Sequence, residues 1–223
     1  SLRIDSLNLY AIEDIDSFKV PMRKFYTAER VAGQWMDTGE LIGPINQADS
    51  HIGNGVIRED GSRIYFTRCA KNWKGTVICE LYYADKDKTG WIPAVRMNDL
   101  VNMPNFTTTQ PAIGRESKKN QEVIYFASDR PGGKGGMDIW YTEFRERQGE
   151  FREPRNVGSK VNTVGTEFTP YYSMSNHKLY FSSDGWPGIG GLDVFASEGE
   201  KSKFQPAIHQ QAEINSPADD LDF

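Results

Sequence analysis

The sequence contains few of the residues from which metal and thiol sites are built. Its 223 residues include three histidines and two cysteines. His51, His177 and His209 are widely separated, and neither a Cys-x-x-Cys nor a His-x-x-x-His pair occurs. Because zinc sites use such spacings, we predict no metal site, and no motif indicates a cofactor.

Long apolar runs and an excess of positive charge are also absent. No stretch approaches the roughly 18 apolar residues that a membrane helix requires, and the N-terminus lacks the layout of a signal peptide. The 31 acidic and 26 basic side chains give a net charge of −5. A broad basic surface for nucleic acid or anionic lipid is therefore not expected. We predict no nucleic-acid partner and no membrane insertion.

Helical periodicity is nearly absent, whereas an aromatic strand pattern recurs. It places Tyr65, Tyr125 and Tyr180 at intervals of 60 and 55 residues. A second strand-like run follows each copy, as "CELYYAD", "MDIWYTE" and "LDVFASE", and "LNLYAIE" at 7–13 matches this run. Further along each unit, an asparagine ends a short outer segment and precedes a polar run: Asn46, Asn102, Asn162 and Asn215. Each unit therefore supplies four short strands.

Four-stranded antiparallel units of about 40–60 residues, rich in aromatics with Gly and Asp turns, are typical of propeller blades. We predict an all-β fold, a β-propeller of four to six blades that forms a single domain over 1–223. The predicted blades are 47–103, 104–163 and 164–215, with a partial blade at 1–46 and an inner strand at 216–223 that belongs to a closing or following blade. Because both ends fall inside a repeat, we expect a module of a longer protein.

Two glycine-rich loops, "SDRPGGKGGMDIWY" at 128–141 and "SSDGWPGIGGLDVF" at 183–196, align without a gap. A phosphate cradle needs a helix after the glycines, but a strand-like run follows here. We instead predict that the glycines allow a wide hairpin to fold back. The bracketing carboxylates are expected to accept amide hydrogen bonds from it; they are Asp129, Asp138, Asp184 and Asp193.

The unit "YFxSDxxxGxGGxDxxxxx", with its "VNTxxxExxPxxS" lead-in, resembles the TolB-type WD-like propeller repeats of OmpA-family outer-membrane proteins. The stretches "SDRPGGKGGMDIWY", "NVGSKVNTVGTEFTPYYS" and "INSPADDLDF" are most similar to the propeller domain of PorE-like components of the type IX secretion system. The blade at 47–103 departs from the pattern, because it lacks the Gly-Gly pair.

The resemblance implies a non-enzymatic interaction or scaffold module, periplasmic and associated with the outer membrane. Its expected partners are envelope or secretion-system proteins, with peptidoglycan bound only through a flanking OmpA-like domain that this sequence does not include. The contact residues that we predict are Trp73 and Trp186, both at hairpin tips where a core role is hard to justify.

The two cysteines, Cys69 and Cys79, occupy the paired strands of one hairpin and flank its nine-residue loop. Cross-strand neighbours come within disulfide distance, so we predict a disulfide, which would suit an oxidising compartment. Two buried thiols are the alternative.

A carboxylate column is the basis of an alternative function. His51, Glu167 and Asp220 each follow the recurring asparagine by five residues, on strands that we place innermost, while Thr107 breaks the set. Such side chains commonly line a solvated channel, and here they are candidates for binding a ligand or cation. Paired carboxylates also serve glycosidases. The alternative is therefore a glycan-binding or glycan-cleaving propeller that uses its axial pocket.

Overall fold

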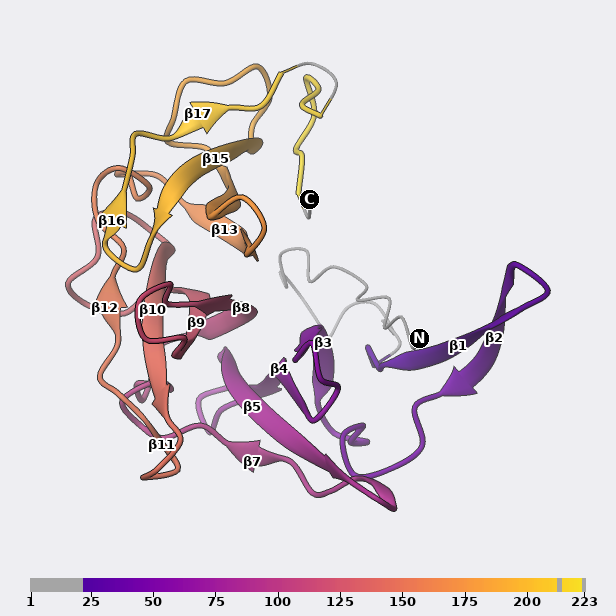
Figure 1. The fold of residues 1–223 in the computed structure, drawn as a ribbon. Helices are drawn as coiled ribbons and strands as arrows, with labels where there is room; N and C mark the ends of the chain where they lie inside the picture. Colours follow the sequence, from indigo (N-terminus) through magenta and orange to yellow (C-terminus); the bar gives the residue numbers. More distant parts are fainter. Residues whose placement is uncertain (1–21, 212–213, 222–223) are drawn as a thin grey trace. The chain divides into compact units, whose positions relative to one another are not determined.

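The computed structural model describes residues 22–211 and 214–221, and every regular element among them is a β-strand (Figure 1). The predicted strand at 7–13 lies outside the described residues. The chain forms two compact units, 1–96 and 97–223, and each is described by itself.

The N-terminal unit contains a hairpin and one complete blade. The hairpin pairs β1 (Tyr26–Val31) with β2 (Gln34–Glu40). The blade, which we call the first blade, consists of β3 (His51–Ile57), β4 (Arg63–Lys71), β5 (Val77–Asp87), β6 (Gly90–Trp91) and β7 (Val95–Arg96). One of its faces packs on the segment before it, in a core of Phe25, Ile45, Ile52, Ile64, Phe66 and Ala84.

The C-terminal unit contains two blades of the same design. The second blade consists of β8 (Thr108–Arg115), β9 (Glu122–Ser128), β10 (Asp138–Arg145), β11 (Glu150–Phe151) and β12 (Arg155–Asn156). The C-terminal blade consists of β13 (Glu167–Ser173), β14 (Lys178–Ser183), β15 (Asp193–Glu200), β16 (Lys203–Phe204) and β17 (Ile208–His209). All three blades lie within the predicted spans.

The three sheets share one antiparallel topology. The first three strands of each blade pair in sequence order, and the fourth is split into two short pieces that both pair with the third. In the second blade, for example, β11 and β12 each pair with β10. The innermost strands carry a register shift in every blade, beside Asn54, Gln110 and Thr169, all with positive φ. Such bulges bend a strand locally.

The recurring asparagine fastens its repeat internally at Asn46, Asn162 and Asn215. The Asn162 amide accepts a hydrogen bond from the Ile139 amide and donates to the Ile139 carbonyl, both at 2.9 Å. Asn215 makes the same two bonds to Val194, and Asn46 makes them to Phe25. The side chain thus replaces a neighbouring strand at that point and satisfies buried backbone groups.

The two blades of the C-terminal unit pack face to face. Tyr125 of β9 stacks on Tyr172 of β13 with ring centroids 5.2 Å apart, and its hydroxyl accepts a hydrogen bond from the Lys201 amide. Lys201 Nζ also pairs with Glu116 at 3.0 Å and Glu143 at 2.8 Å. Aromatic stacking and these ion pairs together fix one blade on the other.

The predicted inner strand at 216–223 is not formed in its described part, 216–221. Three hydrogen bonds join that segment to the C-terminal blade: the Asp220 amide donates to the Leu192 carbonyl, the Leu192 amide donates to Asp219 Oδ1, and Ser182 Oγ donates to the Asp220 carbonyl. So short a segment makes too few ladder bonds to be a strand.

Candidate functional site

The two glycine loops are fastened by their aspartates. Asp138 accepts hydrogen bonds from the amides of Lys134 and Gly135, and Asp193 accepts the equivalent bonds from Ile189 and Gly190. Asp129 and Asp184 accept amides of the preceding segment, from Thr107 and Thr166 respectively. A β-strand follows each loop, so the loops are structural hairpins and lack the helix of a phosphate cradle.

The first blade has a stapled hairpin in place of such a loop. Cys69 and Cys79 are joined by a disulfide with their Cα atoms 4.0 Å apart. Beyond the disulfide the strands continue to a tight turn, where Asn72 Oδ1 accepts the Lys74 and Thr76 amides. Trp73 lies at this tip with 86% of its surface exposed. Trp73 is therefore exposed, as expected for a residue at a hairpin tip.

The prediction that Trp186 is exposed is wrong. Trp186 is half-buried, packs on Phe195, and donates its indole N–H to the Val161 carbonyl at 2.8 Å. The reason is that the glycine loop carrying it folds back on its blade, whereas the first-blade hairpin projects.

Arg130 holds the equivalent place in the second blade. Its guanidinium donates to the carbonyls of Leu100 and Val101 and lies over the rings of Phe126 and Trp140. Burial lowers its pKa to about 10. Sequence comparison gave no signal for this role, because arginine and tryptophan share little except an N–H donor on a flat group.

The proposed axial column is only partly real. Glu167 and Asp220 are equivalent, because their amides donate to Met137 and Leu192, which lie at the same position of successive blades. His51 is one residue out of step: it pairs with Cys69, and Ile52 takes the place of Glu167. Five residues separate Asn46 from Ile52, whereas four separate Asn162 from Glu167, so a fixed spacing after the asparagine misaligns the two strands by one residue.

Glu167 is a fully buried carboxylate. It accepts hydrogen bonds from the Thr163 amide and hydroxyl and from Ser183 Oγ, at 3.0, 2.6 and 2.7 Å. Burial raises its pKa, and the nearby charge of Asp138 acts in the same direction. Asp220 accepts the Ser216 amide in a similar loop. His51 accepts the Arg23 amide, and its pKa is lowered by burial and by the charges of Arg23 and Lys24.

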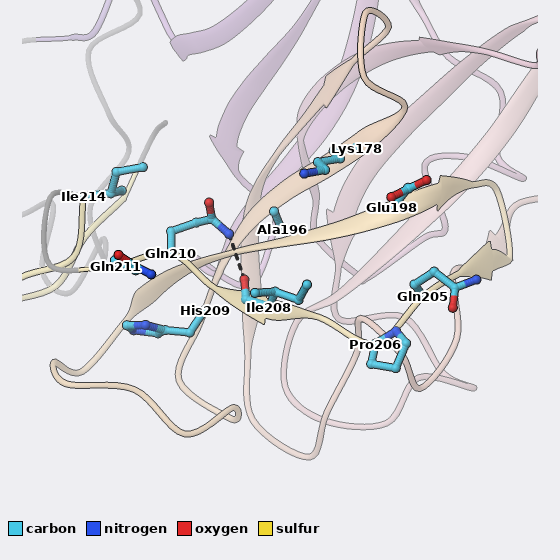
Figure 2. A pocket seen from close by; sticks show the side chains of 10 residues that line it. All are labelled: Lys178, Ala196, Glu198, Gln205, Pro206, Ile208, His209, Gln210, Gln211 and Ile214. Atoms are coloured by element: carbon cyan, nitrogen blue, oxygen red, sulfur yellow. Dashed lines mark hydrogen bonds between the residues drawn. The ribbon is translucent and has the colours of Figure 1, made fainter.

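A pocket of about 560 Å³ opens on the C-terminal blade (Figure 2). Its lining combines a charged pair, three glutamines and an apolar floor: Lys178, Glu198, Gln205, Gln210, Gln211, Ala196, Pro206, Ile208, Ile214 and His209. Lys178 and Glu198 lie on β14 and β15, and the other polar groups come from the segment around β17.

The pocket adjoins a row of side chains that crosses the sheet. Strand pairing places Tyr171, Tyr180, Ala196 and Ile208 side by side on β13, β14, β15 and β17. Tyr171 is 48% exposed and Ile208 is 69% exposed. The tyrosine rings are 6.2 Å apart. We call this row with its pocket the open face.

His209 lies at one end of the pocket, where Nε2 is 3.3 Å from Asp193 Oδ1. Asn215 Nδ2 is 3.0 Å from the same nitrogen, but it also donates to Val194 and Gln210. An Nε2–H tautomer that donates to Asp193 therefore fits best, and it leaves Nδ1 as an acceptor. Asp193 thus fastens both its loop and this histidine.

Within the described ranges, no group of three or more histidine, cysteine or acidic side chains is arranged to hold a metal ion. Nor does that part of the chain contain a helix long and apolar enough to cross a bilayer.

No protein-family model matches the sequence, and no curated protein matches it. Solved structures share its fold. A protein of unknown function from Dyadobacter fermentans has a TM-score of 0.56 at 11% identity, with 87% of this chain and 54% of that chain aligned. The endo-arabinase from Bacteroides thetaiotaomicron has a TM-score of 0.53 at 12% identity, over 85% of this chain and 72% of that chain.

An exo-β-1,3-galactanase from Phanerochaete chrysosporium has a TM-score of 0.52 at 9% identity, over 93% of this chain and 49% of that chain. The chain thus spans about half the length of the Dyadobacter and Phanerochaete proteins. These likenesses establish the β-propeller fold. They also contradict one expectation, the non-enzymatic module implied by the family resemblance, because an endo-arabinase and a galactanase share this fold.

Proposed function

We propose that this protein is a glycan-directed β-propeller that binds a saccharide chain on the open face of its C-terminal blade. The observation that carries the proposal is the exposed row of Tyr171, Tyr180 and Ile208 beside a pocket of amide side chains. The fold likeness supports it, because the endo-arabinase and the galactanase act on glycans.

The apolar half of the open face suits the C–H faces of sugar rings. The half-exposed ring of Tyr171 and the side chain of Ile208 flank Tyr180 and the small Ala196. Aromatic side chains combine a large apolar area with a polar end. A flat row across four strands therefore gives a shallow track in which consecutive sugars find equivalent contacts.

The polar half suits hydroxyl groups, each of which both donates and accepts a hydrogen bond. Gln205, Gln210 and Gln211 supply amides of both kinds. Gln210 Nε2 is held by the Ile208 carbonyl at 2.9 Å, which directs the amide and leaves its oxygen as an acceptor. Lys178 and Glu198, opposite each other on β14 and β15, add one charged donor and one charged acceptor.

Cleavage would need a carboxylic acid with a raised pKa beside a second carboxylate. Glu167 and Asp138 have these properties, but Glu167 has no exposed surface. Its use as an acid would require the Thr163 segment to release its two hydrogen bonds to the carboxylate. The proposal therefore places binding on the open face and assigns hydrolysis, if present, to this separate carboxylate pair.

The test is calorimetric titration of the protein with α-1,5-arabino-oligosaccharides and β-1,3-galacto-oligosaccharides, alongside a glycan array. We expect binding to at least one glycan class and a loss of tenfold or more in Tyr171→Ala and Ile208→Ala. Val164→Ala is the matched control, since Val164 is 87% exposed elsewhere on the same unit. Absence of binding to every glycan, or unchanged affinity in both variants, would overturn the proposal.

A reducing-sugar assay on the glycans that bind distinguishes recognition from cleavage. Product formation that is lost in Glu167→Gln would assign hydrolysis to the buried carboxylate. Product formation that persists in Glu167→Gln would exclude Glu167 as the acid and leave the binding proposal intact.

We also propose that the protein works in an oxidising compartment such as the periplasm, in association with the outer membrane. The Cys69–Cys79 disulfide supports this location. Thiol alkylation of cell extracts under denaturing conditions tests it. Two unmodified cysteines before reduction and two modified cysteines after reduction are expected, and free thiols in fresh extract would contradict it.

A second candidate function is contact with an envelope or secretion-system protein through Trp73. The specific observation is a fully presented tryptophan on a hairpin made rigid by a disulfide, since a rigid aromatic anchor loses little entropy on binding. Trp73→Ala should weaken pull-down of such a partner and leave glycan binding unchanged. Equal recovery of the partner by the variant would exclude the contact.

A further inference from the structure

The outer end of the second blade carries a pocket of about 760 Å³ with an unusual charge. Five cationic side chains line it: Arg115, Lys119, Arg145, Arg147 and Arg152. Two acidic side chains share the lining, Glu122 and Glu146, and two more outside it, Glu150 and Glu143, pair with Arg145 and Arg152. The chain as a whole has a net charge of −5. The positive charge around this pocket is therefore a local feature, because the chain as a whole is acidic.

The positive charge is not a general property of propeller blades. Strand pairing places Arg145 of β10, opposite Glu150, at the same position as Asp87 of the first blade and Glu200 of the C-terminal blade. Two blades thus carry an acid where the second blade carries arginine. The fold therefore does not require a cation at this position; the second blade carries the charge pair in the reverse order, with Arg145 opposite Glu150 where the C-terminal blade has Glu200 opposite Lys203.

Three of the guanidinium groups are already oriented. Arg145 Nη1 is 3.2 Å from Glu150, and Arg152 Nη1 is 3.1 Å from Glu143. Arg115 Nη1 lies 3.3 Å from the Asn120 carbonyl. Each of these contacts uses only part of a guanidinium, which has five N–H donors. The ion pairs and the hydrogen bond orient these guanidinium groups and leave their other N–H donors able to bind a ligand.

The other two cations are available for a ligand. Lys119 and Arg147 are exposed, and neither has a close ion-pair partner among the described residues, although the charge of Lys119 helps to lower the pKa of Glu143. Beneath them lies the buried ring of Phe144, which packs on Phe151 with centroids 4.8 Å apart. The Phe144 carbonyl accepts Gln121 Nε2 at 3.0 Å. The floor is therefore held by packing and a hydrogen bond, whereas the two cations are exposed at the surface.

We propose that this pocket, which is separate from the open face, binds a ligand that carries two or more phosphate groups. Guanidinium groups match phosphate oxygens in a bidentate geometry. A pocket of about 760 Å³ exceeds the size of a single phosphate, so a diphosphate or a phosphorylated sugar fits it better. The same chemistry occurs in soluble phosphate esters and in phosphorylated lipid headgroups.

The experiment is calorimetric titration of the whole protein with inorganic pyrophosphate, with sulfate at equal ionic strength as the comparison. We expect pyrophosphate to bind at least tenfold more tightly than sulfate. The double variant Lys119→Gln with Arg147→Gln should lose tenfold or more in affinity, because it removes two exposed charges without disturbing the ion pairs below. Lys203→Gln is the matched control, since Lys203 lies opposite Glu200 in the equivalent hairpin of the C-terminal blade.

Equal binding of pyrophosphate and sulfate, or pyrophosphate affinity unchanged in the double variant, would overturn the proposal. Vesicles identify the source of the phosphate. Co-sedimentation with phosphatidylglycerol vesicles but not with phosphatidylcholine vesicles, lost in the double variant, assigns a lipid headgroup. Pyrophosphate binding without co-sedimentation assigns a soluble phosphorylated ligand.

Discussion

The second blade and the C-terminal blade have the same strand register but different neighbours on the same sheet face. In the second blade this face carries Tyr125 and Tyr141, both buried beneath the C-terminal blade. In the C-terminal blade the equivalent row contains Tyr171 and Tyr180 and is open, with the pocket beside it. An aromatic row that provides core in one copy thus provides a binding surface in the next.

The comparison shows that a repeat position has no fixed role. The strands are specified by local pattern, whereas the burial of any one side chain depends on what packs against its sheet. Four experiments follow, in order of the size of effect that we expect.

The largest contrast is between two tyrosines at the same repeat position. Tyr125→Ala should lower the free energy of unfolding by about 3–5 kcal/mol, because it removes a buried ring and leaves a cavity. Tyr180→Ala should cost about 1 kcal/mol or less, as is usual for a partly exposed site. Urea denaturation of the two variants measures both. Equal losses would show that the two faces are covered alike.

The second comparison concerns how tightly the two glycine loops pack against the segment that follows each blade. A Cβ atom at Gly135 would lie 2.0 Å from the Gly165 carbonyl oxygen, and one at Gly190 would lie 2.1 Å from that of Ala218. Each alanine variant should lose about 1–3 kcal/mol through overpacking. Gly135→Ala should lose more, since Gly165 lies two residues before β13 and is tied to that strand, whereas the segment at 216–221 leads into no described strand and yields more easily. Thermal unfolding of both variants checks the order, and a greater loss in Gly190→Ala would refute this account.

The buried carboxylate of the C-terminal blade predicts a pH effect that the second blade lacks, since Thr108 takes its place there. Burial raises the pKa of Glu167 above its ordinary value of 4.5. The native state therefore holds this proton more tightly than the unfolded state. Stability is lost as the pH rises above 4.5 and through the raised pKa.

Glu167→Gln should remove that loss, so the stability of the variant relative to the natural protein should increase with pH. Chemical denaturation of both proteins from pH 4 to pH 8 gives the trend. Parallel curves would mean that Glu167 does not titrate in this range.

The smallest effect concerns the ion pairs that join the two blades. Burial opposes the charge on Lys201, but hydrogen bonds to Glu143 and Glu116 hold its pKa above the usual value. Lys201→Met should cost about 1 kcal/mol, a modest sum because the pairs are partly exposed. The loss should shrink in high salt. If the loss does not depend on salt, the stabilisation comes from the packing of the Lys201 side chain and not from its ion pairs.

The sequence predicted the blades well because their signal is local. Tyr65, Tyr125 and Tyr180 mark the second strand of each blade, and the strand order follows from short hairpins. The aspartates of the glycine loops were also predictable, since a carboxylate beside a tight loop accepts nearby amides. The Cys69–Cys79 pair followed from two cysteines on facing strands of one hairpin.

The candidate sites were less predictable. Trp186 was expected at the surface because its loop looks like a tip, yet the glycines fold that loop back on the blade. Counting from the asparagine assigned His51 to the same repeat position as Glu167. The strand register shows that the equivalent residue of the first blade is Ile52, one residue later. The open face and the cationic pocket join residues from several strands, and no contiguous motif marks either.

The sequence by itself determined that this chain forms antiparallel blades, where the hairpins turn and that the two cysteines face each other across one hairpin, because those features depend on neighbours along the chain. Only the tertiary structure decided which tyrosine rows are core and which are surface, which tryptophan is presented and where positive charge gathers. Those properties depend on the packing of one sheet against another, and two repeats with the same strand register can meet different neighbours.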